Sequence, residues 1–276
     1  MTEHPQAPPG PFEITGETAE MVKAPHPIQI AGILFDKDGT LLDYARSWVP
    51  VNYEIARIAA RDDADLGAAL LRAAGMDPDT GVVTPDSLLA AGNTAEIAEG
   101  MVGAGAPWTP AALTVALDDL FSRSAAFAVP VTDLSALFSA LRARGYKLGV
   151  ASSDNEASIR RTAERFGFDD CLDYVAGYDS GYGVKPEPGM VHGFCAATGL
   201  IPDEVVVVGD NNHDMHMGRN AGVGLTVAVL TGTGSRQSLA SASDHCLADI
   251  TELAALLDRL GSAEAGQDVA LPDVAS

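Results

Sequence analysis

Short apolar segments alternate with amphipathic segments along most of this chain, and this alternation constrains its fold more than any other feature. Residues 204–208 read Glu-Val-Val-Val-Val, which is typical of a strand buried on both faces of a sheet. We predict further strands at 28–35, 146–152, 172–176, 224–230 and 246–250, with helices at 135–144, 156–166, 190–198, 215–220 and 251–260. This order predicts an α/β protein with a Rossmann-like, doubly wound parallel sheet.

One long stretch departs from the alternation. Between residues 44 and 129 the apolar residues recur only at helical spacing, so we predict an inserted α-helical cap there. The α/β core would then comprise 28–43 and 130–261. The proline-rich start, 1–27, and the small, acidic end, 262–276, are expected to be disordered tails.

Composition narrows the possible partners. The chain is 47% hydrophobic, enough for a large core, and 17 Lys plus Arg against 38 Asp plus Glu give a formal net charge of −21. Such a charge repels nucleic acids and anionic membrane surfaces. The longest uncharged candidate for a membrane span, 221–235, is broken by glycines and is too short to cross a bilayer. We therefore expect a small-molecule ligand, with no nucleic acid and no membrane.

The cysteines suggest a cellular location. Cys171, Cys195 and Cys246 are odd in number and lack the spacing of a metal site. The start of the chain has no basic and apolar pattern of a signal peptide. We expect buried thiols in a reduced, cytoplasmic protein, present as a monomer or a homodimer.

Polar side chains follow several of the predicted strands. In open α/β sheets, sites lie beyond the carboxyl ends of the strands, so these side chains should converge. They are Asp36, Asp38, Ser152, Asp210 and Asp214, joined by Lys185 on a loop. Carboxylates for a hard cation, an amine and a hydroxyl donor suit phosphoryl transfer, which depends on positioning and charge stabilisation.

Four ordered motifs carry a family resemblance. They are Phe-Asp-Lys-Asp-Gly-Thr-Leu-Leu at 35–42, Val-Ala-Ser-Ser at 150–153, Val-Lys-Pro-Glu-Pro at 184–188 and Val-Gly-Asp-Asn-Asn-His-Asp at 208–214. Together they resemble the haloacid dehalogenase superfamily, in the branch that contains phosphoglycolate phosphatase, and the helical insertion is similar to that branch's small mobile cap. The resemblance implies an Mg²⁺-dependent phosphatase acting on a small phosphorylated metabolite, with phosphoglycolate the leading suggestion.

The resemblance also implies roles for individual residues. Asp36 would be the nucleophile that forms an aspartyl-phosphate, and Asp38 the general acid and base. The turn at Gly39 and Thr40 would offer backbone N–H groups to the phosphate. Ser152, Ser153 and Lys185 would bind the phosphate as well. The Mg²⁺ ligands would be Asp36, the carbonyl of Asp38, and Asp210, with Asp214 acting through water or a neighbouring group.

Other residues are less firmly placed by the sequence. Lys37 stands where an apolar residue is more usual, and strand alternation points it away from the nucleophile. His213 and His216 match no motif position and are expected in packing or solvent. At the start of the cap, Arg46 could grip a substrate carboxylate or hydroxyl pair and Trp48 could form a flat wall; packing for Trp48 and solvent for Arg46 are the alternatives.

Alternative functions stay open at this stage. A β-phosphoglucomutase-like mutase would share all four motifs. A non-catalytic phosphate-binding regulatory protein is an alternative of another class, although every motif position holds a chemically competent residue. Asp38 argues against a dehalogenase, and the lack of lysine in 44–129 argues against a Schiff-base phosphonate hydrolase.

Overall fold

A computed structural model describes residues 29–124 and 127–265 of the chain. Its parallel strands form one six-stranded sheet in the order β3-β2-β1-β4-β5-β6, which confirms the predicted doubly wound α/β fold. The strands are β1 (Gly32–Phe35), β2 (Lys147–Ala151), β3 (Tyr174–Ala176), β4 (Val205–Gly209), β5 (Leu225–Val229) and β6 (His245–Leu247). The strand order reverses between β1 and β4, the place where such sheets bind ligands.

Helices cover both faces of the sheet because alternate side chains of the strands point to opposite sides. Ile33 and Phe35 of β1 pack on the side of α6 (Leu134–Ala143), α7 (Glu156–Phe166) and α11 (Leu253–Ala265). Leu34 packs on the other side, with α8 (Gly189–Thr198) and α9 (Asn212–Ala221). A short helix, α10 (Arg236–Leu239), follows β5.

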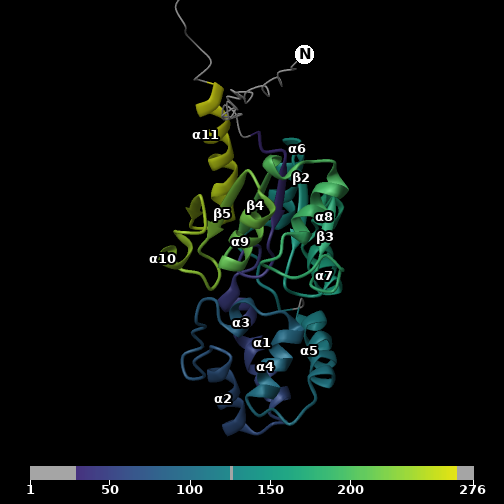
Figure 1. Cartoon of the computed structure of the whole chain (residues 1–276), viewed down its shortest axis with the longest axis vertical. Coiled ribbons are helices and arrows are strands. Elements are labelled where there is room, and N and C mark those ends of the chain that lie inside the picture. Colours follow the sequence, from purple (N-terminus) through teal and green to yellow (C-terminus); the bar gives the residue numbers. More distant parts are fainter. Residues whose placement is uncertain (1–28, 125–126, 266–276) are drawn as a thin grey trace, which may run out of the picture.

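The segment after β1 forms a separate helical layer, drawn below the sheet in Figure 1. Its helices are α1 (Tyr44–Ala59), α2 (Ala64–Ala73), α3 (Leu88–Ala91), α4 (Thr94–Gly103) and α5 (Pro110–Ser124). Apolar faces of these helices meet in a core of their own, which includes Ile55, Leu70, Met101 and Leu117. We keep the name cap for this layer.

Several predicted boundaries differ from the structure. The helix predicted at 215–220 begins at Asn212, and the strand predicted at 246–250 is replaced after Leu247 by a turn of 3₁₀-helix at Ile250–Glu252. The tail predicted from residue 262 starts too early, because α11 continues to Ala265. The predicted tail at 1–27 and residues 266–276 lie outside the described residues.

Two further findings concern the cysteines and the membrane. Of the three cysteines only Cys195 is buried, whereas Cys171 and Cys246 are partly exposed, so the prediction of three buried thiols is wrong for two of them. In the described ranges, the helices are all too short or too polar to cross a bilayer.

Candidate active site

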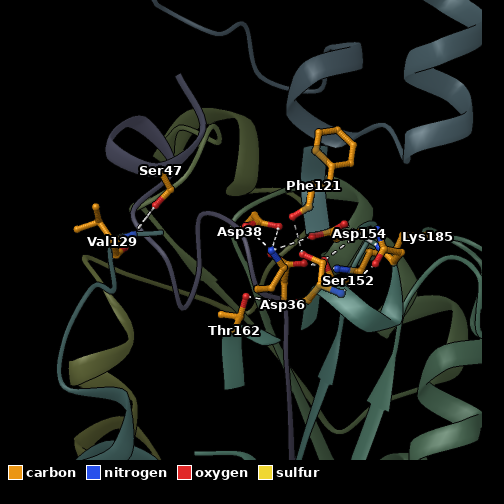
Figure 2. A network of polar contacts seen from close by, with 12 residues as sticks. Asp36, Asp38, Ser47, Phe121, Val129, Ser152, Asp154, Thr162 and Lys185 are labelled. Carbon is orange, nitrogen blue, oxygen red and sulfur yellow. Dashed lines mark hydrogen bonds and ion pairs between the residues drawn. The ribbon is translucent and has the colours of Figure 1, made fainter. Parts of the chain in front are cut away.

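The register of the sheet brings three of the motifs to one edge. Phe35 at the end of β1 pairs with Val150 of β2 and with Val208 of β4. Asp36 therefore lies directly beyond β1, while Ser152 and Asp210 follow their strands at nearly the same level. Figure 2 shows Asp36 and Ser152 close together at the ends of the strands, with Asp38, Asp154 and Lys185 beside them.

Lys185 joins two of the motif aspartates. Its ammonium lies 2.5 Å from Asp36 Oδ1 and 2.6 Å from Asp214 Oδ1, and all three side chains are buried. Burial alone would lower the pKa of Lys185, but the charges of Asp214 and Asp36 raise it above its ordinary value. The lysine is therefore a fixed positive charge beside the predicted nucleophile.

The start of α9 holds Asp214 in place. Asn211 caps the helix, and the other oxygen of Asp214 accepts a hydrogen bond from the Asn211 N–H at 3.1 Å. One carboxylate oxygen thus completes the helix cap while the other accepts from Lys185. Asp210 is held in a similar way, because its Oδ2 accepts from the Thr233 N–H at 2.8 Å.

Three carboxylates form a compact group that could hold a metal. Asp36, Asp210 and Asp214 each place an oxygen within 4.8 Å of the others, and all are buried. Burial raises the pKa of Asp36 to about 6 against the opposing charge of Lys185. Burial and the neighbouring charges of Asp36 and Asp214 raise the pKa of Asp210 well above its ordinary range. Clustered, dehydrated oxygen donors of this kind fit Mg²⁺, which prefers carboxylate ligands.

A second buried lysine, Lys37, contacts the other aspartate of the first motif. Its ammonium lies 2.8 Å from Asp38 Oδ1, 2.6 Å from Asp38 Oδ2 and 3.1 Å from Asp154 Oδ2. As alternation predicted, the ammonium is directed to these carboxylates and not to Asp36. Burial raises the pKa of Asp38 to about 6, although the Lys37 charge opposes this rise.

The turn at Gly39 has a geometric role that differs from the predicted one. Its φ of +86° favours glycine, and a Cβ there would lie 2.5 Å from the Asp210 carboxyl carbon. However, the Gly39 N–H donates to the Leu42 carbonyl, and the Thr40 side chain is fully buried. Neither residue lines the cavity between the core and the cap, and the Gly39 N–H already has an acceptor, so only the contact of the Thr40 N–H with the phosphate stays a prediction. Gly39 instead lets the chain pass against Asp210.

A cavity of about 70 Å³ lies between these side chains and the cap. On the core side its walls include Asp36, Asp38, Ser152, Lys185 and Asp210. On the cap side they include Tyr44, Trp48, Asn52 and Ile55 of α1, which follow one another on a single helical face, together with Ile97 and Phe121. The cap thus contributes mainly apolar and uncharged side chains.

Several predicted residues are placed differently by the structure. Arg46 is exposed and does not line the cavity, because on α1 it lies about 200° around the helix from Trp48. The structure thus agrees with the alternative that Arg46 lies in solvent, and gives no support to a contact between Arg46 and substrate. His216 is exposed as expected, but His213 lines the cavity, and burial lowers its pKa. Ser153 also lines the cavity, and its hydroxyl donates to the Ala91 carbonyl of the cap at 3.4 Å.

The sequence did not single out three residues that support the site. Asp154 contacts Lys37, Thr233 holds Asp210, and Asn52 lines the cavity. Asp154 directly follows the second motif, and this position could have identified it as a residue of the site. Thr233 lies after β5 on a loop whose contact with Asp210 depends on tertiary folding, and no sequence pattern pointed to it.

The parallel sheet, the helical cap and the clustered aspartates together define a class of protein. Comparison with known proteins identifies that class. The haloacid dehalogenase-like hydrolase family matches residues 30–222. The chain is 34% identical over 133 residues to phosphoglycolate phosphatase of Rhodospirillum rubrum, covering 48% of this chain and 54% of the relative. It is 32% identical over 83 residues to pyrophosphatase PpaX of Halalkalibacterium halodurans, covering 30% of this chain and 39% of the relative. The matches thus span about half or less of these relatives.

Solved structures share the fold over most of this chain at low sequence identity. CbbY from Rhodobacter sphaeroides in complex with phosphate aligns with a TM-score of 0.63 and 19% identity, covering 83% of this chain and 100% of that one. A predicted phosphoglycolate phosphatase from Haemophilus somnus aligns with a TM-score of 0.62 and 20% identity, covering 83% and 98%. The chain belongs to the haloacid dehalogenase-like hydrolase family.

Proposed function

We propose that this protein is an Mg²⁺-dependent phosphomonoester hydrolase that works through an aspartyl-phosphate on Asp36. The observation that carries the proposal is the pairing of Asp36 with the buried Lys185, beside the carboxylates of Asp210 and Asp214. A buried nucleophile next to a fixed ammonium suits attack on a dianionic phosphoryl group, since the ammonium offsets charge on the phosphoryl oxygens.

The reaction would proceed in two steps. In the first, a carboxylate oxygen of Asp36 attacks phosphorus, the bond from phosphorus to the ester oxygen breaks, and Asp38 donates a proton to the departing oxygen. In the second, Asp38 takes a proton from a water molecule as the water oxygen attacks phosphorus, and the bond to Asp36 breaks. Ser152, which also lines the cavity, is placed to donate to a phosphoryl oxygen.

Asp36 and Asp210 would hold the Mg²⁺ together with the backbone carbonyl of Asp38, and Asp214 would act mainly through Lys185. When bound, Mg²⁺ would supply positive charge against the phosphoryl oxygens and offset the repulsion among the carboxylates. The raised pKa values of Asp36 and Asp210 support this assignment, because burial and neighbouring carboxylates disfavour their charged forms, which a bound cation would favour.

The cavity favours a small ester with an uncharged leaving group. Lys185, already paired with two carboxylates, is the one lysine or arginine among the described residues that line it. A carboxylate on the leaving group would therefore be buried against the cap without a cation, which is costly. Phosphoglycolate and pyrophosphate, which the names of relatives suggest, carry extra negative charge. They therefore fit the uncharged cap side of the cavity less well than the phosphate ester of a short alcohol.

Phosphate release from a panel of phosphorylated metabolites tests the proposal. We expect Mg²⁺-dependent release of inorganic phosphate that excess chelator stops and added Mg²⁺ restores, with Ca²⁺ a poor substitute because it favours larger and looser coordination. Conversion of a sugar phosphate into its isomer, without release of inorganic phosphate, would indicate a mutase. Phosphate binding without turnover of any ester would favour the non-catalytic alternative.

A further inference from the structure

Lys37 is a buried cation that the two-step reaction has not used. Its side chain is 3% exposed and occupies a position between the two aspartates of the first motif. The ammonium spans both oxygens of Asp38, at 2.8 and 2.6 Å, and reaches Asp154 at 3.1 Å. A lysine is rarely buried so completely unless its charge is paired, and here two carboxylates from different loops supply that pairing.

The same ammonium contacts the cap. It lies 5.5 Å from the centre of the Trp48 ring, within the range of a cation–π interaction. Trp48 in turn packs edge-on against Phe121 of α5, with 5.1 Å between ring centres. Lys37 therefore contacts the carboxylate of Asp38, the loop after β2 and helix α1 of the cap, and Trp48 continues this chain of contacts to α5.

We infer that Lys37 is a positioning residue for Asp38. When Trp48 of the cap lies over the Lys37 ammonium, Lys37 holds Asp38 so that its proton is directed at the leaving oxygen. One oxygen of Asp38 stays on the Lys37 ammonium while the other carries the proton to the departing ester oxygen. The inference rests on the proposed function of Asp38 as general acid.

A comparison of two leaving groups isolates this role. The value of kcat/KM reports only the steps up to departure of the alcohol, so it excludes hydrolysis of the aspartyl-phosphate. Glycerol phosphate has a poor leaving group that needs a proton, whereas p-nitrophenyl phosphate releases a stable anion that needs almost none. A defect in aiming Asp38 should therefore appear with the first substrate and not with the second.

The test uses Lys37→Met in the full chain. We expect kcat/KM for glycerol phosphate to fall on the order of 10²-fold, the loss typical of a misplaced catalytic group, and kcat/KM for p-nitrophenyl phosphate to change by less than about threefold. Lys147→Met is the matched control, because Lys147 is exposed, pairs with Asp173 and lies at the opposite end of β2. This control should leave both substrates unaffected.

A second variant separates positioning from folding. Lys37→Met leaves Asp38 and Asp154 buried without their shared cation, which can lower stability. The double variant Lys37→Met with Asp154→Asn removes one positive and one negative charge, so it should melt closer to the wild type while keeping the selective loss on glycerol phosphate. Equal losses on both substrates, or no loss on either, in folded variants would overturn the inference. Turnover retained in Asp36→Asn would instead contradict the proposed function itself.

Discussion

Each aspartate of the first motif has its own buried lysine. Asp36 pairs with Lys185, and Asp38 pairs with Lys37. Burial nevertheless raises the pKa of both carboxyls to about 6, so dehydration outweighs the lysine charges at both positions. The two side chains remain chemically distinct, because Asp36 belongs to the cluster of carboxylates that could hold a metal, and the Asp38 carboxylate does not belong to it.

Replacing the general acid should slow turnover of esters with poor leaving groups. For Asp38→Asn we expect kcat with glycerol phosphate to fall about 10²–10⁴-fold, since an amide cannot donate or accept the required proton. Steady-state kinetics at pH 7 measures this. Asp133→Asn, an exposed helix cap that an asparagine can maintain, is the control. An unchanged kcat for Asp38→Asn would assign the proton transfer to another group.

The raised pKa values also predict how stability depends on pH. Asp36 and Asp210 have higher pKa values in the folded protein than when unfolded, so the stability linked to their protonation is complete below about pH 4. For Asp36 it is lost as the pH rises through about 6, and for Asp210 it is lost as the pH rises through its own raised pKa. In chelator, this contribution should lower the melting temperature between pH 5 and pH 7. Mg²⁺ should therefore raise the melting temperature more at pH 7 than at pH 5, where protons compete for its ligands.

Thermal melts with chelator and with Mg²⁺ at both pH values measure this effect. Asp210→Asn should remove most of the Mg²⁺ response, because it replaces one of the clustered carboxylates. An Mg²⁺-induced shift that is larger at pH 5 than at pH 7 would contradict the assignment of these aspartates as ligands.

Among the elements, α1 decides which part of the cap faces the site. Tyr44, Trp48, Asn52 and Ile55 share the face that lines the cavity, and Arg46 lies on the opposite side. The sequence placed α1 near the nucleophile but did not give its rotation. That rotation follows from the cap core, into which Ile55 and Ala56 pack.

Two substitutions on α1 test this orientation. We expect Arg46→Ala to leave kcat/KM for the best metabolite within about twofold of the wild-type value. The Arg46 side chain is exposed, and truncation of an exposed side chain usually has a small effect. Trp48→Ala should lower kcat/KM on the order of tenfold or more, since it removes the wall over Asp38 and its contact with Phe121. A large selective loss for Arg46→Ala alone would show that the cap presents another face to the substrate.

Strand positions were predictable from the sequence because buried parallel strands are continuous apolar runs, as in Val205–Gly209. The motif residues converge because those strands end at one edge. The start of α9 was missed because its first turn is polar and shows no apolar period, although Asn211 and Asp214 form a capping box. The partners of Lys37 could not be predicted, since Asp154 and Trp48 meet it only in the folded protein.

At the scale of the whole molecule, the cap and the sheet enclose a small cavity within a protein of formal net charge −21. Polar contacts connect the two layers around that cavity. Asn212 of α9 donates to Asp86 of the cap at 2.9 Å, and Tyr178 contacts Asp118 of α5 at 3.1 Å. The overall negative charge offers an anionic substrate no attraction, so under the proposed function the substrate would depend on Lys185 and the proposed Mg²⁺.

This charge distribution predicts the order of substrates. We expect kcat/KM for glycerol phosphate to exceed that for phosphoglycolate by at least about tenfold, because the glycolate carboxylate would be buried beside uncharged cap residues. Both esters can be compared under the same Mg²⁺ concentration and ionic strength. A preference for phosphoglycolate would mean that a cation from elsewhere reaches the cavity, and it would overturn the proposed substrate class.

In the proposed reaction the phosphoryl group passes through Asp36, and chemical trapping of the phosphorylated enzyme tests this step. Enzyme is mixed with a phosphate ester and Mg²⁺, and the reaction is quenched in acid during turnover. Tritiated borohydride then reduces the acyl phosphate to an alcohol, which releases the phosphate and leaves tritium on the peptide for mapping. We predict that the tritium locates to Asp36, and that Asp36→Asn, although folded, neither acquires tritium nor turns over. Label on another residue, or turnover in Asp36→Asn, would contradict the account.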